Sequence, residues 1–160
     1  MRPISLIVAG LAGLAPATAD SLPGPVPAEI VRVIDGDTLR VRAAVWINQT
    51  IEVSVRLAGV DTPEIMRPEC RAERIMADAA KSTVESLAGD TVQLRNIRHG
   101  KYAGRVVADI ETASGEDLGA YLLSAGQAVR EGDHDPWCDP DQPIPSAESA
   151  RPGVSQGRAP

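Results

Sequence analysis

Aromatic residues are scarce in this chain. Its 160 residues include two Trp, two Tyr and no Phe. Aromatic rings therefore cannot fill the interior of a domain of this length, and its core has to be built from Val, Leu, Ile and Ala. The length itself fits a single domain.

The chain also lacks an excess of basic residues. It has 16 Lys and Arg against 22 Asp and Glu, which gives a net charge of −6. This balance argues against a protein that holds nucleic acid by bulk charge, because such binding needs many neutralising cations. It permits an enzyme that grips one or two phosphates locally. Basic residues do gather in one stretch, which contains Arg95, Arg98, His99, Lys101 and Arg105.

Long apolar runs are absent apart from one near the N-terminus. Residues 4–14 are largely apolar, Arg2 precedes them, and Ala17-Thr18-Ala19 fits the small-x-small rule for cleavage. We expect a signal peptide over 1–19 and export of the mature chain to the periplasm or the medium. An N-terminal membrane anchor is the alternative, but the run is shorter than the ~20 apolar residues that cross a bilayer, and Pro16 follows it.

Cysteine is equally scarce, with Cys70 and Cys138 as the only two. In an oxidising compartment two thiols of one small domain usually pair, so we expect a disulfide between them. The alternative is a zinc site that these cysteines would build with His99 and His134. The four residues lack the C-x-x-C and H-x-x-x-H spacings that zinc sites use.

One compact β-branched run and four stretches with recurring apolar positions predict five β-strands, and two further stretches predict helices. The predicted strands are 30–34, 38–45, 51–57, 91–97 and 105–110, and the predicted helices are 71–87 and 117–125. Five short strands with a helix after the third favour a small closed barrel, in a mainly β (α+β) fold, over a βαβ sheet.

The composition also sets the expected domain boundaries. Residues 20–27 are rich in Pro and read as a linker, and 28–138 contain the predicted strands and helices. Residues 139–160 are rich in Pro, Ser and Gly, which predicts a disordered C-terminal tail.

Two short acidic segments stand beside the predicted strands. Asp35-Gly36-Asp37-Thr38 follows the first strand, and Asp61-Thr62-Pro63-Glu64 follows the third. If the hairpin between them folds back, both segments emerge on one rim. Asp37 and Asp61 then form an open site of oxygen ligands, which suits Ca²⁺. Each Asp on its own is also typical of a residue that closes a turn.

Three further side chains complete a candidate site for phosphate chemistry. A carboxylate at Glu64 can take a proton from a metal-bound water. Arg56 and Arg105 offer planar guanidinium groups that match two phosphate oxygens. The alternatives are a helix N-terminal charge for Glu64 and a solvated strand face for each Arg. Together these residues indicate a metal-dependent phosphodiesterase.

The ordered set of motifs resembles the staphylococcal nuclease (thermonuclease) family over about residues 28–138. The set consists of Asp35-Gly36-Asp37-Thr38, Arg56, Asp61-Thr62-Pro63-Glu64, Cys70-Arg71-Ala72-Glu73, Lys101-Tyr102-Ala103-Gly104-Arg105, Asp117-Leu118, Gly126-Gln127-Ala128 and Trp137-Cys138.

This resemblance implies a five-stranded OB-fold barrel with two or three helices that cleaves DNA and RNA with Ca²⁺. The implied roles are calcium binding by Asp37, Asp61 and the Thr62 carbonyl, activation of water by Glu64, neutralisation of the phosphorus centre by Arg56 and Arg105, and contact with a neighbouring phosphate by Lys101 and Tyr102. We expect an exported, monomeric nuclease that is free of the membrane once its signal peptide is removed.

A non-catalytic OB-fold module that binds nucleic acid or protein is the alternative function. Arg130-Glu131-Gly132 stands where members of the family often carry a tyrosine that stacks on substrate, and an acidic run follows over 131–141. The set of Glu64, Arg56 and Arg105 favours the enzyme, because a pure binder has no need of a base.

Overall fold

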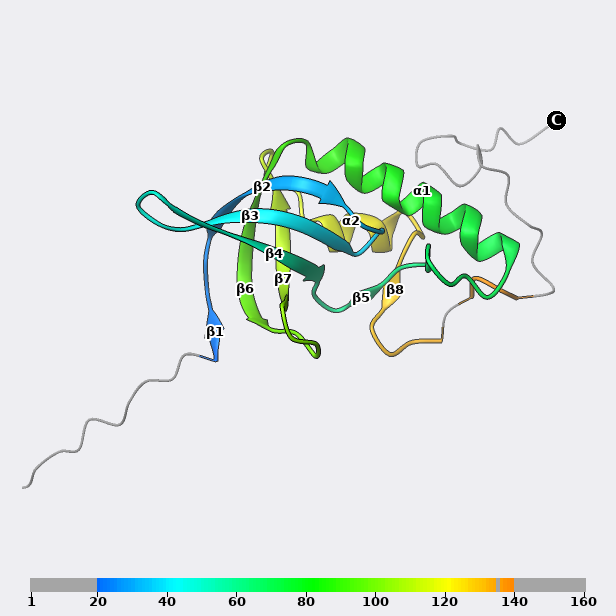
Figure 1. Ribbon diagram of the computed structural model, residues 1–160. Helices are drawn as coiled ribbons and strands as arrows, with labels where there is room; N and C mark the ends of the chain where they lie inside the picture. Colours follow the sequence, from blue (N-terminus) through cyan, green and yellow to red (C-terminus); the bar gives the residue numbers. More distant parts are fainter. Residues whose placement is uncertain (1–19, 135, 140–160) are drawn as a thin grey trace, which may run out of the picture.

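Five long strands close into a barrel in the computed structural model, which describes residues 20–134 and 136–139 (Figure 1). The strands are β2 (Val26–Val33), β3 (Thr38–Trp46), β4 (Gln49–Leu57), β6 (Thr91–His99) and β7 (Arg105–Thr112). Hydrogen bonds join them in the order β6-β2-β3-β4-β7, and a β6–β7 pairing completes the ring. Only the β4–β7 pairing is parallel. This is the expected OB-fold barrel of an α+β domain.

The barrel interior is aliphatic, as the composition requires. The largest fully buried side chains include Leu39, Leu57, Leu94, Ile110 and Leu122. They lie at alternate positions of the strands or on the inner face of a helix, so each element buries one face. Aromatic residues contribute little to the described part of the chain, where Trp137 is the only aromatic residue that is buried.

Two helices occur among the described residues, and both match their predicted ranges closely. Helix α1 (Arg71–Ala88) covers the barrel in Figure 1, and α2 (Leu118–Ser124) lies on another side of it. The buried face of α1 carries several alanines, which let its backbone approach the strands closely. In the described part of the chain, neither helix combines the length and apolarity that a membrane crossing requires.

The stretch 20–27 differs from the linker expected there. Strand β1 (Ser21–Leu22) pairs with β6, and β2 already begins at Val26 and pairs with β6 as well. A proline removes only its own N–H from a strand pairing, so the remaining groups of this stretch still bond to β6. The signal peptide expected over 1–19, and all of the tail expected over 139–160 except Asp139, lie outside the described residues.

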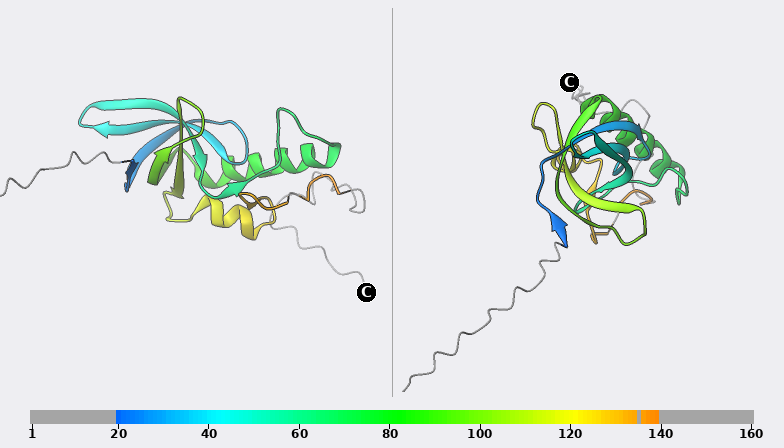
Figure 2. Two further views of the ribbon diagram at one scale, coloured as in Figure 1. Left: turned by 90° about the horizontal axis from the view of Figure 1, so that it is seen from below. Right: turned by 60° about the vertical axis from the view of Figure 1, so that its left-hand side comes forward.

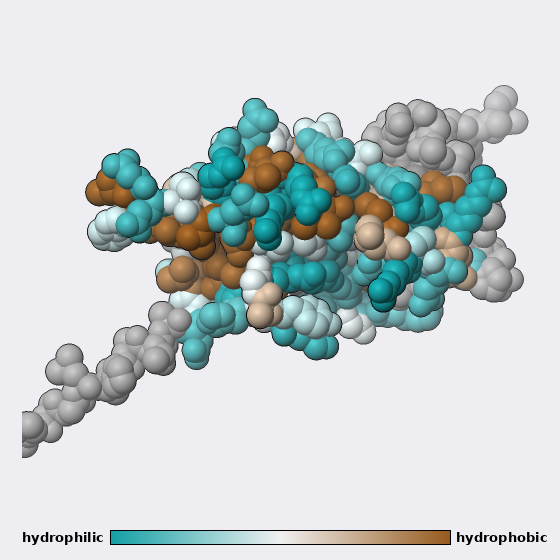
Figure 3. Space-filling model, in the orientation of Figure 1, coloured by the Kyte–Doolittle hydropathy of each residue, from teal (hydrophilic) through white to brown (hydrophobic). Residues whose placement is uncertain are grey.

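The β3–β4 hairpin extends beyond the barrel. Figure 2 shows its tip at the end of the molecule away from the first turns of α1. The tip exposes Val45, Trp46 and Ile47, and apolar surface is visible there in Figure 3. The opposite end of this hairpin joins the turn before β3 and the chain after β4, which are the two acidic segments. The hairpin therefore folds back as expected and brings those segments to one end of the barrel.

Candidate active site

The guanidinium group of Arg56 joins the two acidic segments. Its Nη1 donates a hydrogen bond to Asp37 Oδ1 at 2.6 Å, and its Nη2 donates to Asp61 Oδ1. Nη2 also reaches the Val60 carbonyl oxygen at 3.4 Å. Three of the residues singled out in the sequence therefore meet in one cluster, although they come from a turn, a barrel strand and a short strand.

Strand register explains why this meeting occurs. Val55 and Leu57 point into the barrel, so Arg56 between them points outward. Thr38 pairs with Arg56 across β3 and β4, and the Leu57 N–H donates to the Asp37 carbonyl at 2.7 Å. These pairings hold Asp37 beside the guanidinium group. Strand β5 (Val60–Asp61) follows β4 after a short turn and brings Asp61 to its other side.

Gly36 lets the turn before β3 approach this cluster. A Cβ atom at this position would lie 2.9 Å from the Ala80 Cβ on α1 and 3.0 Å from the Thr62 Cβ. Both distances are shorter than ordinary van der Waals contact. A side chain at residue 36 would therefore push the turn away from the segment that carries Thr62.

Asp37 is almost completely buried and is surrounded by donors. Besides Arg56, the Thr38 hydroxyl donates to its Oδ1 at 2.8 Å, and the Thr62 N–H donates to its Oδ2 at 3.3 Å. Burial raises the pKa of Asp37 to about 7, and the Asp35 charge adds to this effect, whereas Arg56 opposes it. Asp37 and Asp61 thus share one guanidinium group, on which the charge of Asp35 also acts.

The pKa of Arg56 moves the opposite way from what burial alone would cause. Burial lowers it, but the charges of Asp37 and Asp61 outweigh burial and raise it above its usual value. The guanidinium group therefore stays charged at any working pH. The alternative role for Asp37 and Asp61 was to close a turn. In the first acidic segment Asp35 has that role, because its Oδ1 accepts the Asp37 N–H at 3.2 Å.

Glu64 follows this cluster in the chain, and its side chain is exposed. Its alternative role as a helix N-terminal charge does not apply, because α1 begins seven residues later, at Arg71. The acidic residue in the first turn of α1 is Glu73. Glu73 instead accepts the backbone N–H of Glu64 at 3.0 Å.

Arg105 lies one strand away from the cluster, at the start of β7. Arg105 pairs with Ser54 of β4, which precedes Arg56 by two residues. The residues of β7 that point into the barrel occupy every second position, and Arg105 is not one of them. Arg105 and Arg56 therefore share the outward face of two neighbouring strands. The Arg105 guanidinium carbon lies 5.6 Å from the centre of the Tyr102 ring, and Lys101 Nζ lies 6.0 Å from the same centre.

A disulfide joins Cys70 and Cys138, with 5.8 Å between their Cα atoms. Sulfur atoms bonded to each other do not also ligate zinc as thiolates, so the zinc alternative does not fit this structure. Within residues 20–134 and 136–139, no cluster of three or more His, Cys, Asp or Glu side chains is arranged to hold a metal ion. A calcium ion at Asp37 and Asp61 would therefore need backbone carbonyls and water as further ligands.

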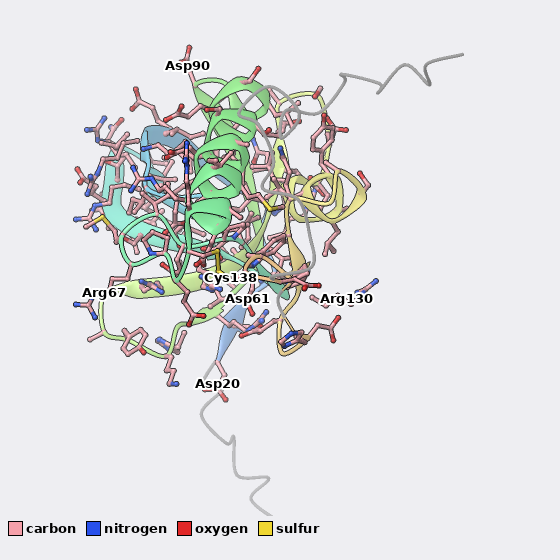
Figure 4. All side chains as sticks on the ribbon, turned by 90° about the vertical axis from the view of Figure 1, so that its right-hand side faces the viewer. Asp20, Asp61, Arg67, Asp90, Arg130 and Cys138 are labelled. Carbon is pink, nitrogen blue, oxygen red and sulfur yellow. A yellow bond between two sulfur atoms is a disulfide. The ribbon has the colours of Figure 1, made fainter. Side chains whose placement is uncertain are left out.

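The segment Arg130-Glu131-Gly132, where the resemblance leads one to expect a stacking tyrosine, lies beside β5. Strand β8 (Val129–Arg130) pairs with β5, with Val129 opposite Asp61, and the Glu131 N–H donates to the Gly59 carbonyl at 3.0 Å. Figure 4 labels Asp61 and Arg130 from these two strands. The acidic run thus begins next to the strand that carries Asp61. Its members Asp135 and 140–141 lie outside the described residues.

Four further residues contribute to this site in roles that the sequence alone does not indicate. Asp35 and Thr38 bind Asp37, Gly36 gives the turn its close approach, and Glu73 holds the Glu64 backbone. Two of them nevertheless have a signal in the sequence. Thr38 directly follows the predicted ligand Asp37, and Glu73 stands three residues after Cys70, the N-cap of α1.

Comparison with known proteins identifies a family. A model of the staphylococcal nuclease homologue family matches residues 54–150, which is more than half of the chain. The match includes Arg56, Asp61, Glu64 and Arg105 and begins after Asp37, which the hydrogen bond from Arg56 connects to the same centre. No curated protein matched the chain.

Proposed function

The chain belongs to the staphylococcal nuclease homologue family, and we propose that it is a calcium-dependent nuclease that hydrolyses phosphodiester bonds of DNA or RNA. One observation supports this proposal more strongly than the others. Arg56 bridges Asp37 and Asp61 at the point where the segment carrying Glu64 leaves the barrel. Carboxylates that can bind a metal, a guanidinium group that stabilises charge on phosphate oxygens and a base are groups that suit metal-dependent phosphodiester hydrolysis.

The donor set fits calcium. Asp37 and Asp61 both bind one guanidinium group, and the charge of Asp35 acts on that group as well, so the carboxylates outnumber the cation. Burial of Asp37 further disfavours its charged form and raises its pKa. A hard divalent cation would relieve this excess, and carboxylate and carbonyl oxygens are its preferred ligands. Asp37, Asp61 and the Thr62 carbonyl would hold it. When bound, calcium supplies Lewis-acid stabilisation of charge on a phosphate oxygen.

The residues of the chain divide the remaining work. Glu64 takes a proton from the water that attacks phosphorus, and its exposed side chain has access to solvent. Arg56 and Arg105 donate hydrogen bonds to the phosphate oxygens, on which negative charge grows in the transition state. Arg105 assists departure of the 5′-oxygen as its bond to phosphorus breaks. The phosphate stays on the 3′ end of the other product.

Substrate binding uses the turn between β6 and β7. Lys101 and Tyr102 are exposed there and lie next to Arg105, so they are available to a phosphate beside the one being cleaved. The basic residues of this region give an acidic protein a local site for a polyanion. We propose that the protein acts as a monomer after export to the periplasm or the medium, where a disulfide persists.

Cleavage of plasmid and single-stranded DNA by the purified protein, with calcium or with EDTA, tests the proposal. We expect cleavage only with calcium, and a fall of about 100-fold or more in Glu64→Gln, because general bases contribute on that scale. Glu85→Gln, at an exposed position of α1, is the matched control and should keep full activity. Binding of DNA without any cleavage would instead support the non-catalytic OB-fold module.

A further inference from the structure

Glu73 is a buried carboxylate that the proposed chemistry does not use. It lies in the first turn of α1 and is 6% exposed. None of the ion pairs among the described residues includes it. Burial of a charged group without a cation is costly, so the hydrogen bonds that Glu73 accepts have to offset that cost.

Both of its oxygens bind the same segment of chain. Oε1 accepts the Glu64 N–H at 3.0 Å, and Oε2 accepts the Glu69 N–H at 2.5 Å. Residues 62–70 contain no helix or strand, so no strand pairing holds the backbone there. One carboxylate therefore fixes both ends of the segment 64–69, and bonds from backbone N–H groups to a charged acceptor are among the strong ones.

The carboxylate is itself held in place by its surroundings. The Glu73 N–H donates to Cys70 Sγ at 3.4 Å, which caps α1, and Cys138 Sγ packs 3.8 Å from Glu73 Oε2. A disulfide sulfur has no hydrogen to donate, so the second contact is packing. The neighbouring Arg74 Nη1 donates to the Ile65 carbonyl at 2.9 Å and adds a further tie from α1 to the same segment.

We propose that Glu73 is a positioning residue of the nuclease, because it fixes the backbone from which the base Glu64 extends. This inference rests on the function proposed above. A glutamine at position 73 would have the same shape and could accept only one of the two N–H groups, since its NH₂ would face the other. The isosteric change would therefore release one end of the segment and leave the packing volume unchanged.

Glu73→Gln tests this inference, with Glu85→Gln as the matched control on the same helix. Glu85 is exposed, and its carboxylate lies 3.9 Å from Lys81. Amide hydrogen exchange measured by NMR should become about 10-fold faster at Glu64 or Glu69 in Glu73→Gln. The Thr62 amide, which donates to Asp37, should keep its rate in both variants.

The kinetic constants separate positioning from general loss of structure. In Glu73→Gln we expect kcat to fall ~10–100-fold, because small displacements of a catalytic group have effects of that size. KM for DNA and the calcium concentration for half-maximal rate should stay within about 3-fold of wild type, since neither the arginines nor the calcium ligands contact Glu73 directly. Circular dichroism at the assay temperature checks that the variant is folded.

Three results would overturn the inference: unchanged exchange at both amides, an unchanged kcat, or a parallel loss of kcat, DNA binding and calcium binding in the folded variant. An inactive wild-type protein would contradict the proposed function itself. In that case the amide exchange rates would still show whether Glu73 holds the segment, so the two failures are distinguishable.

Discussion

Replacement of Arg56 by Gln leaves the Asp37 carboxylate buried without its cation. The Asp37 side chain is 4% exposed and the Arg56 side chain 23%, so water solvates little of the pair. Loss of one partner from a buried pair costs about 3–5 kcal/mol. The partial exposure of Arg56 and the ability of Asp37 to bind a proton both reduce this cost. We expect the free energy of unfolding to fall by about 2–3 kcal/mol at pH 8 without calcium.

Urea unfolding followed by circular dichroism, in EDTA, measures this difference. Arg42→Gln is the matched control, because Arg42 binds Glu29 at 2.9 Å with side chains that are 45% and 61% exposed. An exposed pair of this kind contributes no more than about 1 kcal/mol. Saturating calcium should narrow the gap between Arg56→Gln and wild type, because the ion supplies positive charge that the variant lacks.

Equal destabilisation of the protein by Arg56→Gln and Arg42→Gln would contradict this prediction. That result would mean that the Asp37 carboxylate does not depend on the guanidinium group for neutralisation. A gap that calcium leaves unchanged would separate the stabilising role of Arg56 from the proposed calcium site.

Three further predictions concern stability. Burial raises the pKa of Asp37 from 3.8 to about 7. Between these pH values the folded metal-free protein keeps a proton that the unfolded chain loses. The free energy of unfolding should therefore fall by up to ~4 kcal/mol as the pH rises from 3.8 to about 7. Urea titrations should show this fall in wild type and lose most of it in Asp37→Asn. The Cys70–Cys138 disulfide closes a loop between two residues that are 68 positions apart, so its reduction should lower the free energy of unfolding by about 4 kcal/mol and lower the urea midpoint. A Cys70→Ser, Cys138→Ser variant whose urea midpoint still changes with reductant would contradict this explanation. Gly36→Ala should cost ~1–3 kcal/mol and weaken calcium binding in calorimetry, because its Cβ crowds α1; unchanged stability and affinity would mean that the turn has room to move.

The barrel could be predicted because its strands bury one face and expose the other. In β3 the positions of Leu39, Val41 and Ala43 are buried, and the residues between them are more exposed. Such alternation is visible in a sequence over eight or nine residues. Strands β1, β5 and β8 have two residues each, which is too short for any pattern, so their pairing depends on the rest of the fold.

The candidate site could be predicted only as a set of residue types. Asp37 and Asp61 stood out because they flank a hairpin, and Arg56 because it precedes the second of them. The bridge that Arg56 forms depends on the register of β3 with β4 and on the turn into β5, which no local pattern records. The same holds for Glu73, which reads as an ordinary helix N-terminal residue until the path of 64–69 is known.

A calcium site at Asp37 and Asp61 is tested by the rate of DNA cleavage as a function of free calcium, for wild type, Asp37→Asn and Asp61→Asn. Asp90→Asn is the control, since Asp90 is exposed and lies beyond the C-terminal end of α1 (Figure 4). We predict saturable calcium dependence in wild type and a half-saturating concentration at least ~10-fold higher in both site variants, with the control unchanged. Cleavage that persists in EDTA, or site variants with the calcium dependence of wild type, would rule out catalysis by a calcium ion held by Asp37 and Asp61.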